Sequence, residues 1–166
     1  MSNDPPWARV LQLLRDEPGL THLQAADRLD LAHDTVARHL WLARVAGEEI
    51  PYVRGKRPRP ISPGRIAALL TPKQRNLLLA VSEGVVVDRL VLGERYAVRL
   101  DLPVSDDRTR RYGGIRATKT VQGLAHLRLV TLDGAAQAAN GDRLWRLTER
   151  GHRVLSAAML DEKEPS

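Results

Sequence analysis

The absence of both cysteine and phenylalanine is what most constrains the fold of this 166-residue chain. Without cysteine it has no disulfides, no thiolate metal ligands and no thiol nucleophile. Because aromatic residues make up only 4% of the sequence, the core must be built mainly from Leu, Val and Ala. Such a core suits small helical layers, and the length predicts one ordinary domain or two small ones.

Basic charge is concentrated in two short segments. The net charge of +6 suggests a polyanionic partner, most simply nucleic acid. Residues 54–65 carry five basic groups and no acid, and residues 108–119 carry five more, again with no acid. This clustering favours phosphate contact over an evenly solvated surface. The excess of arginine, 22 against four lysines, fits guanine recognition, but coding bias in a GC-rich genome is the favoured explanation, so the excess alone decides nothing.

The sequence lacks the marks of membrane proteins and of common enzymes. No apolar run is long enough to span a bilayer, and the N-terminus is acidic and proline-bearing, unlike a signal peptide. We therefore expect a soluble, cytoplasmic protein with no membrane partner. The five histidines lie at no metal-ligand spacing, and no phosphate-binding glycine loop or nucleophile-elbow serine is present. We expect no enzyme activity, no cofactor and no metal site.

Residues 1–66 predict a first domain with three helices. Pro5–Pro6 precede the first helix, and Thr21 with Gln24 predicts a capping box for the second. The third helix is expected from about His33 to Ala46, with Gly47 as its stop. Helical spacing predicts the buried positions Trp7, Val10, Leu11 and Leu14 in the first helix, Leu23, Ala26 and Leu29 in the second, and Val36, Leu40 and Ala43 in the third.

The segment Gln24–Leu40, QAADRLDLAHDTVARHL, resembles the helix-turn-helix of the winged-helix superfamily. The small Ala26 stands where two helices approach closely, and Leu31 fills the turn between them. Val36 and Leu40 anchor the helix that the resemblance makes the recognition helix. Any three-helix bundle shows a similar periodicity, but the turn spacing favours helix-turn-helix.

Two positions depart from the helix-turn-helix pattern. Asp30 stands where glycine is common, and Ala32 where a serine-like cap is usual.

Ile50–Val53 and Pro60–Ile61 bracket the basic residues 54–59, which predicts a wing of two short strands with a cationic tip. An Arg/Lys-Pro stretch of this kind suits the minor groove or the phosphates. A proline-stiffened linker between domains is the alternative interpretation.

Residues 67–166 predict a second, divergent winged-helix domain. Thr71 caps a helix Pro72–Glu83, whose predicted buried residues are Leu77, Leu78 and Val81. Val85–Leu92 and Tyr96–Leu102 then predict a β-hairpin around Gly93–Glu94, in the place of the usual second helix. A helix over Val86–Leu92 is the alternative for the first of these strands.

The last third of the chain predicts a helix, a wing and a closing helix. Ile115–Val130 has the spacing of a recognition helix that runs into a wing strand, with Arg128 where the family often has glycine. Val130–Asp133 and Arg143–Leu147 are expected to pair as wing strands. Thr148 is expected to cap a helix Glu149–Leu160 that buries Val154, Leu155 and Met159.

The fold class predicted from these elements is mainly α with small β-wings (α+β), as a tandem winged helix-turn-helix. The resemblance implies binding of double-stranded DNA, most simply by a transcriptional repressor that acts as a homodimer. In the first domain the candidate DNA-binding residues are His33, Asp34, Thr35, Arg38, His39, Arg54, Lys56, Arg57 and Arg59. In the second domain they are Arg110, Arg111, Arg116, Thr118, Lys119 and Gln122.

Arg38 is the best candidate for reading a base, because its guanidinium matches the guanine edge. Two other function classes stay open. Tandem winged helices also occur in plasmid or phage replication and partition proteins, and winged helices also serve as protein–protein adaptors. A second domain that mediates dimerisation instead of DNA binding is a further alternative.

Overall fold

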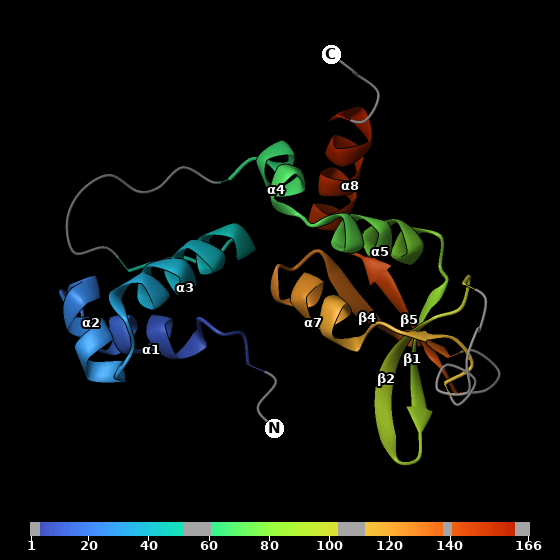
Figure 1. Ribbon diagram of the computed structural model, residues 1–166, viewed down its shortest axis with the longest axis horizontal. Helices are drawn as coiled ribbons and strands as arrows, with labels where there is room; N and C mark the ends of the chain where they lie inside the picture. Colours follow the sequence, from blue (N-terminus) through green and yellow to red (C-terminus); the bar gives the residue numbers. More distant parts are fainter. Residues whose placement is uncertain (1–3, 52–60, 103–111, 138–140, 162–166) are drawn as a thin grey trace. The chain divides into compact units, whose positions relative to one another are not determined.

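The computed structural model describes the following residues of the chain: 4–51, 61–102, 112–137 and 141–161. The chain divides into two compact units, unit 1 (Met1–Ile61) and unit 2 (Ser62–Ser166) (Figure 1). The boundary falls after Ile61 and not after residue 66, because the helix that begins at Pro63 packs within unit 2. In its described part unit 1 is helical, whereas unit 2 joins helices to one antiparallel sheet, so the architecture is α+β.

Three helices that pack on one another form the described part of unit 1: α1 (Ala8–Asp16), α2 (His22–Leu29) and α3 (His33–Ala46). The predicted apolar stripe of α1, from Trp7 to Leu14, is buried, and so are Val36, Leu40 and Ala43 of α3. An ion pair between Glu17 and Arg28 ties the end of α1 to α2.

The buried face of α2 differs from the prediction at Leu23. Its side chain is 60% exposed, whereas Ala25 and Ala26 are buried and Leu29 is half-buried. Helical spacing is compatible with an apolar face that includes either Leu23 or Ala25, so the sequence alone does not show which of the two is buried. The small side chain of Ala25 permits the closer packing of neighbouring helices.

Unit 2 begins with α4 (Pro63–Leu69), a short helix that sequence analysis did not predict. The Ser62 hydroxyl caps it by accepting a hydrogen bond from the Arg65 amide at 3.4 Å. The helix packs on the C-terminal helix α8 (Glu149–Asp161). Serine followed by proline is a helix-start signal, so these two residues would have allowed the prediction.

The next helix, α5 (Pro72–Ser82), begins and packs as predicted. The Thr71 hydroxyl accepts a hydrogen bond from the Gln74 amide, and the Gln74 side chain accepts one from the Thr71 amide. Leu77, Leu78 and Val81 are buried. The start of α5 is therefore fixed by its own sequence, and its buried face packs into the core of unit 2.

Five strands form one sheet in unit 2, in the order β3-β2-β1-β5-β4, and each neighbouring pair is antiparallel. The strands are β1 (Val86–Val91), β2 (Glu94–Arg99), β3 (Ile115–Arg116), β4 (Val130–Gln137) and β5 (Arg143–Leu147). The helix α7 (Thr118–His126) connects β3 to β4 and packs against α5 and β2.

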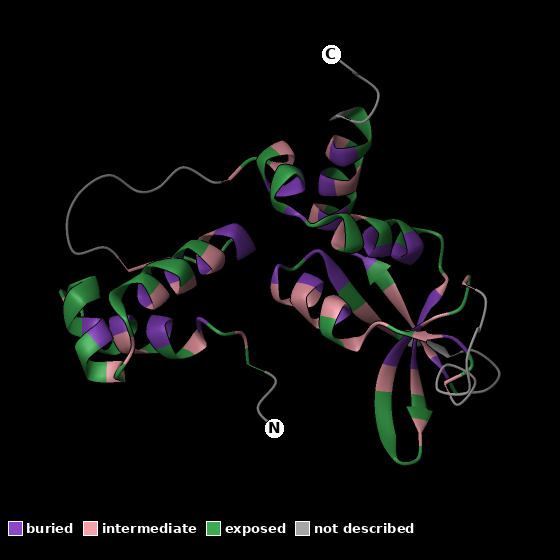
Figure 2. Cartoon of the chain, in the orientation of Figure 1, coloured by how far each residue is buried: buried purple, intermediate pink, exposed green. Residues whose placement is uncertain are grey.

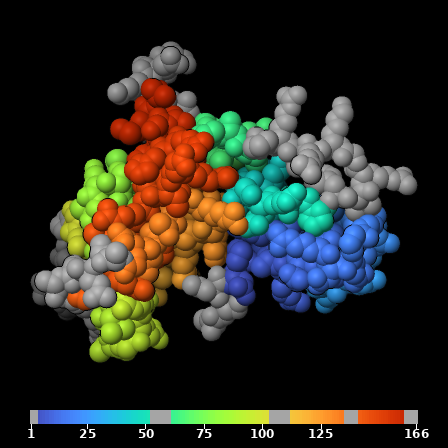
Figure 3. Space-filling model, turned by 180° about the vertical axis from the view of Figure 1, so that it is seen from behind, coloured from blue at the N-terminus to red at the C-terminus, as the bar shows by residue number. Residues whose placement is uncertain are grey.

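The hairpin β1–β2 confirms the predicted pair of strands, and the helical alternative for Val86–Leu92 is wrong. Its turn is Leu92–Gly93, one residue earlier than predicted, and Glu94 already belongs to β2. Leu92 and Gly93 have φ values of +51° and +82°, as a two-residue hairpin turn requires. The hairpin projects from the rest of unit 2 (Figures 1 and 3). Leu92 in its turn is 86% exposed.

Within Ile115–Val130, where a helix running into a wing strand is predicted, the helix α7 covers only Thr118–His126. Ile115 and Arg116 form β3 instead, because they pair with Arg99 and Val98 of β2. At the other end Arg128 adopts a φ of +57°, the left-handed conformation that the glycine of the resemblance would supply. The chain then turns directly into β4 at Val130.

The two predicted wing strands pair as expected, although β4 continues to Gln137, beyond the predicted end at Asp133. The Thr148 hydroxyl caps α8 by accepting a hydrogen bond from the Gly151 amide at 3.0 Å. In α8 Val154 is buried, but Met159 is 48% exposed and Ala158 takes the buried place. Ala158 lies four residues after Val154, so it falls on the same face.

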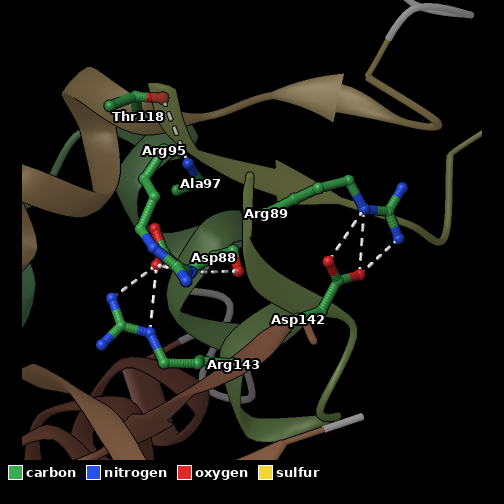
Figure 4. Close-up of polar contacts among 7 residues, drawn as sticks. All are labelled: Asp88, Arg89, Arg95, Ala97, Thr118, Asp142 and Arg143. Atoms are coloured by element: carbon green, nitrogen blue, oxygen red, sulfur yellow. Dashed lines mark hydrogen bonds and ion pairs between the residues drawn. The ribbon is translucent and has the colours of Figure 1, made fainter. Parts of the chain in front are cut away.

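The buried carboxylates of Asp88 and Asp142 connect neighbouring parts of the sheet through arginine side chains (Figure 4). Asp88 of β1 accepts hydrogen bonds from Arg95 of β2 at 2.9 Å and from Arg143 of β5 at 2.8 Å. Asp142 accepts from Arg89, and the same guanidinium donates to the Tyr112 carbonyl at 2.9 Å. Each carboxylate therefore joins segments that lie far apart in the sequence.

Candidate nucleic-acid interface

The turn between α2 and α3 is set by local sequence. Thr21 and Gln24 form the predicted capping box, with the Gln24 amide 3.2 Å from the Thr21 hydroxyl. Three residues separate the two helices, and the first of them, Asp30, adopts a left-handed conformation with φ +52°. Aspartate tolerates that conformation better than most residues, which explains why glycine is not needed there. The third residue, Ala32, starts α3 without a side-chain cap.

Four of the predicted site residues of unit 1 lie in the N-terminal half of α3. The helix has both exposed and buried positions (Figure 2). His33, Asp34 and Arg38 are exposed, and Thr35 is half-buried beside the core residue Val36. His33 Nδ1 lies 3.9 Å from the Asp34 carboxylate. The structure therefore brings these four predicted residues together on one helix.

Arg38 has the side chain on this surface best suited to bind a base. Within the part of the chain that the structure describes, its side chain makes no hydrogen bond and no ion pair. An exposed guanidinium without a partner keeps its donors available for two parallel hydrogen bonds to the O6 and N7 of guanine.

His39 is less available than predicted. It is half-buried, and its Nδ1 atom is buried without a hydrogen-bond partner in the described residues. Sequence analysis instead missed Trp41, which is 40% exposed three residues after Arg38. Helical spacing places positions 34, 38 and 41 on one face, which is the signal that would have identified this tryptophan.

The predicted basic contacts at Arg54, Lys56, Arg57, Arg59, Arg110 and Arg111 lie outside the described residues. The wing that sequence analysis predicts at residues 54–59 is therefore not described either. Its flanking residues, 48–51 and 61, form neither helix nor strand.

In unit 2 the predicted residues have different environments. Lys119 is exposed on α7 and Gln122 is half-buried. The Thr118 hydroxyl accepts a hydrogen bond from the Ala97 amide at 3.2 Å, which fixes the start of α7 against β2. Sequence analysis missed this structural role.

Arg116 is engaged with aromatic rings. Its guanidinium carbon lies 4.3 Å from the centroid of the Tyr96 ring and 5.9 Å from that of Tyr112. The Tyr96 hydroxyl donates a hydrogen bond to Glu94, which raises the pKa of that tyrosine above its ordinary value. This stacking fixes the direction of Arg116, so it is a weaker candidate for base recognition than Arg38.

The described residues contain no cluster of three or more side chains suited to hold a metal ion, and no helix among them is long and apolar enough to cross a membrane. Comparison of the chain with protein-family models, curated proteins and solved structures finds no match. What the chain binds must therefore be inferred from its own residues and geometry.

Proposed function

We propose that the chain binds double-stranded DNA in a sequence-specific manner and acts as a transcriptional repressor. The observation that carries this proposal is the pair α2–α3, joined by a three-residue turn, with the unpartnered Arg38 on the exposed face of α3. A helix-turn-helix joins two helices by a turn of three or four residues, and the turn between α2 and α3 has that length.

In the proposed mode, α3 lies in the major groove. Its 14 residues make a helix about 21 Å long, and the groove admits one helix of that width. Arg38 donates to a guanine edge, and His33, Asp34 and Thr35 contact neighbouring bases or the backbone. The basic residues of 54–59 contact phosphates or the minor groove and add affinity that does not depend on sequence.

Unit 2 supports a second, divergent winged-helix assignment. Its helix α7 is followed directly by the antiparallel pair β4–β5, which is the order of a recognition helix and its wing. Lys119 is the exposed cation at the start of α7.

The test is selection of bound duplexes from random DNA with the full chain, together with its solution mass. We expect one enriched motif that contains guanine, and for a homodimer two inverted half-sites about 10 base pairs apart. Binding that selects no motif would contradict sequence recognition. Motifs repeated at a replication origin, with none at promoters, would favour the replication or partition alternative over repression.

Replacing Arg38 with alanine is expected to remove discrimination at one base position. The loss of one bidentate contact is worth about 1–3 kcal/mol, or roughly five- to 150-fold at that position. Titration of the selected duplex and its single-base variants measures the change. Arg9→Ala, at an exposed arginine of α1, serves as the control with the same change of charge. Equal losses on every duplex would contradict the assignment of Arg38 as a base reader.

Neutralising Arg54, Lys56 and Arg57 together is expected to flatten the salt dependence of DNA binding. Each lost phosphate contact lowers the slope of log K against log salt by about 0.9, so three contacts lower it by about 2.7. Titrations at several salt concentrations give the slope. The base preference should stay the same, and an unchanged slope would rule out phosphate contact by this segment.

A further inference from the structure

A pocket of about 370 Å³ lies within unit 2, between α5, the end of β2 and the start of α7. Its volume is in the range of pockets that hold small molecules, about 300–1,000 Å³. Ala117 and Thr120 at the start of α7 form part of its wall. Nothing in the proposed DNA contact uses this pocket.

The pocket is positively charged. Its lining includes Lys73, Arg99 and Arg116, and none of the lining residues, all of which the structure describes, is acidic. Arg99 is already paired, because its Nε and Nη2 atoms each donate to Asp101 at 2.6 Å. These hydrogen bonds lower the pKa of the Asp101 carboxyl, so that carboxyl stays ionised and balances Arg99.

Of the three cations in the lining, Lys73 is the one that neither pairs with a carboxylate nor stacks on an aromatic ring. It is exposed near the start of α5, and within the described ranges it makes no hydrogen bond or ion pair. Arg116 is held over Tyr96, whereas the ammonium group of Lys73 is on a flexible stem that follows a ligand. An anionic group in the pocket would therefore be bound by Lys73 first.

The rest of the lining is mostly apolar. The buried Leu77 of α5 and Ile115 of β3 both line the pocket, and Asn76 and Thr120 supply an amide and a hydroxyl. An apolar wall with few polar groups suits an organic molecule better than a bare inorganic ion.

We propose that this pocket binds a small organic anion, with its acidic group at Lys73 and its apolar body against Leu77 and Ile115. The proposal goes beyond DNA binding and does not depend on it. Because the same pocket touches the first turn of α7, its occupant also contacts the candidate recognition helix of unit 2.

A matched pair of fluorescent probes tests the proposal on the full chain. One is 8-anilinonaphthalene-1-sulfonate, and the other is N-phenyl-1-naphthylamine, which has the same rings without the sulfonate. We expect one equivalent of the sulfonate to bind, more tightly than the neutral probe. Lys73→Met should weaken the sulfonate by about fivefold, the upper end for an exposed ion pair, and leave the neutral probe unchanged.

Two further variants keep the test decisive. Lys119→Met removes the same charge from α7 at a residue that does not line the pocket, and it should change neither affinity. Asn76→Trp fills the pocket from an exposed position, so it should abolish both signals while the circular dichroism spectrum stays unchanged. Equal affinities for the two probes, equal effects of the two lysine variants, or sulfonate binding that survives Asn76→Trp would each overturn the proposal.

Discussion

Replacing Gly151 with alanine is expected to destabilise unit 2 by about 3 kcal/mol or more, a large share of the stability of an ordinary domain. A Cβ atom at this position would lie 2.0 Å from the carbonyl oxygen of Leu129 and 3.0 Å from its carbonyl carbon. Both are backbone atoms, so no side-chain rotation relieves the clash. The first turn of α8 would have to move away from the strand connection that it packs on.

The surrounding contacts show why that movement is costly. The Thr148 amide donates to the Leu129 carbonyl at 3.1 Å, and the Thr148 hydroxyl donates to the Arg128 carbonyl at 2.6 Å. Thr148 also caps α8 at Gly151. Displacing the helix therefore disrupts the helix cap together with the two hydrogen bonds that Thr148 donates to backbone carbonyls.

Urea unfolding measures the effect, with hydrogen exchange to locate it in unit 2. The control is Gly64→Ala, because a Cβ at Gly64 of α4 meets no atom within 4 Å. Alanine favours helix over glycine, so this control should be neutral or slightly stabilising. Equal midpoints for the two variants would show that the close approach at Gly151 does not limit stability.

Local signals in the sequence were sufficient for most element boundaries. The capping boxes at Thr21 and Thr71 and the stop at Gly47 fix helix ends by hydrogen bonds within a few residues. The hairpin β1–β2 was predicted for the same reason, since its strands are joined by a turn of two residues. Interactions between residues only a few positions apart can be predicted from their spacing in the sequence.

Features that depend on distant partners were missed or misplaced. Ile115 reads as helical by spacing, but pairing with Arg99 makes it part of a strand. Leu23 and Met159 are apolar and correctly spaced, yet neighbouring elements bury Ala25 and Ala158 in their place. Periodicity predicts a face, and only tertiary packing decides which edge of it is covered.

The candidate site also has features that local sequence predicts and features that depend on distant residues. The exposure of Arg38 follows from its place opposite Val36 and Leu40 on one helix, so the sequence was enough to predict it. The stacking of Arg116 on Tyr96 and the bond from Ala97 to Thr118 join residues about twenty positions apart. No spacing rule connects such residues before the fold is known.

Asp88 is the residue whose removal we expect to weaken the sheet most. Its side chain is 10% exposed and its Oδ2 atom accepts from both Arg95 and Arg143. Arg143 lies directly opposite Asp88 across β1 and β5, so strand register aligns this pair. Breaking a buried ion pair by removing one partner costs about 3–5 kcal/mol. Both arginines are partly exposed, so we expect about 3 kcal/mol for Asp88→Ala.

A comparison of single variants separates this network from ordinary packing. Arg143→Ala should cost less than Asp88→Ala, because Asp88 keeps Arg95, whereas losing the carboxylate leaves two neighbouring cations without it. Glu149→Ala removes an exposed pair with Arg153 and should cost about 0.5 kcal/mol or less. Urea midpoints give the order, and hydrogen exchange should rise first in β1 and β5. If Asp88→Ala were no more harmful than Glu149→Ala, the carboxylate would be dispensable, and apolar packing alone would hold the strands in register.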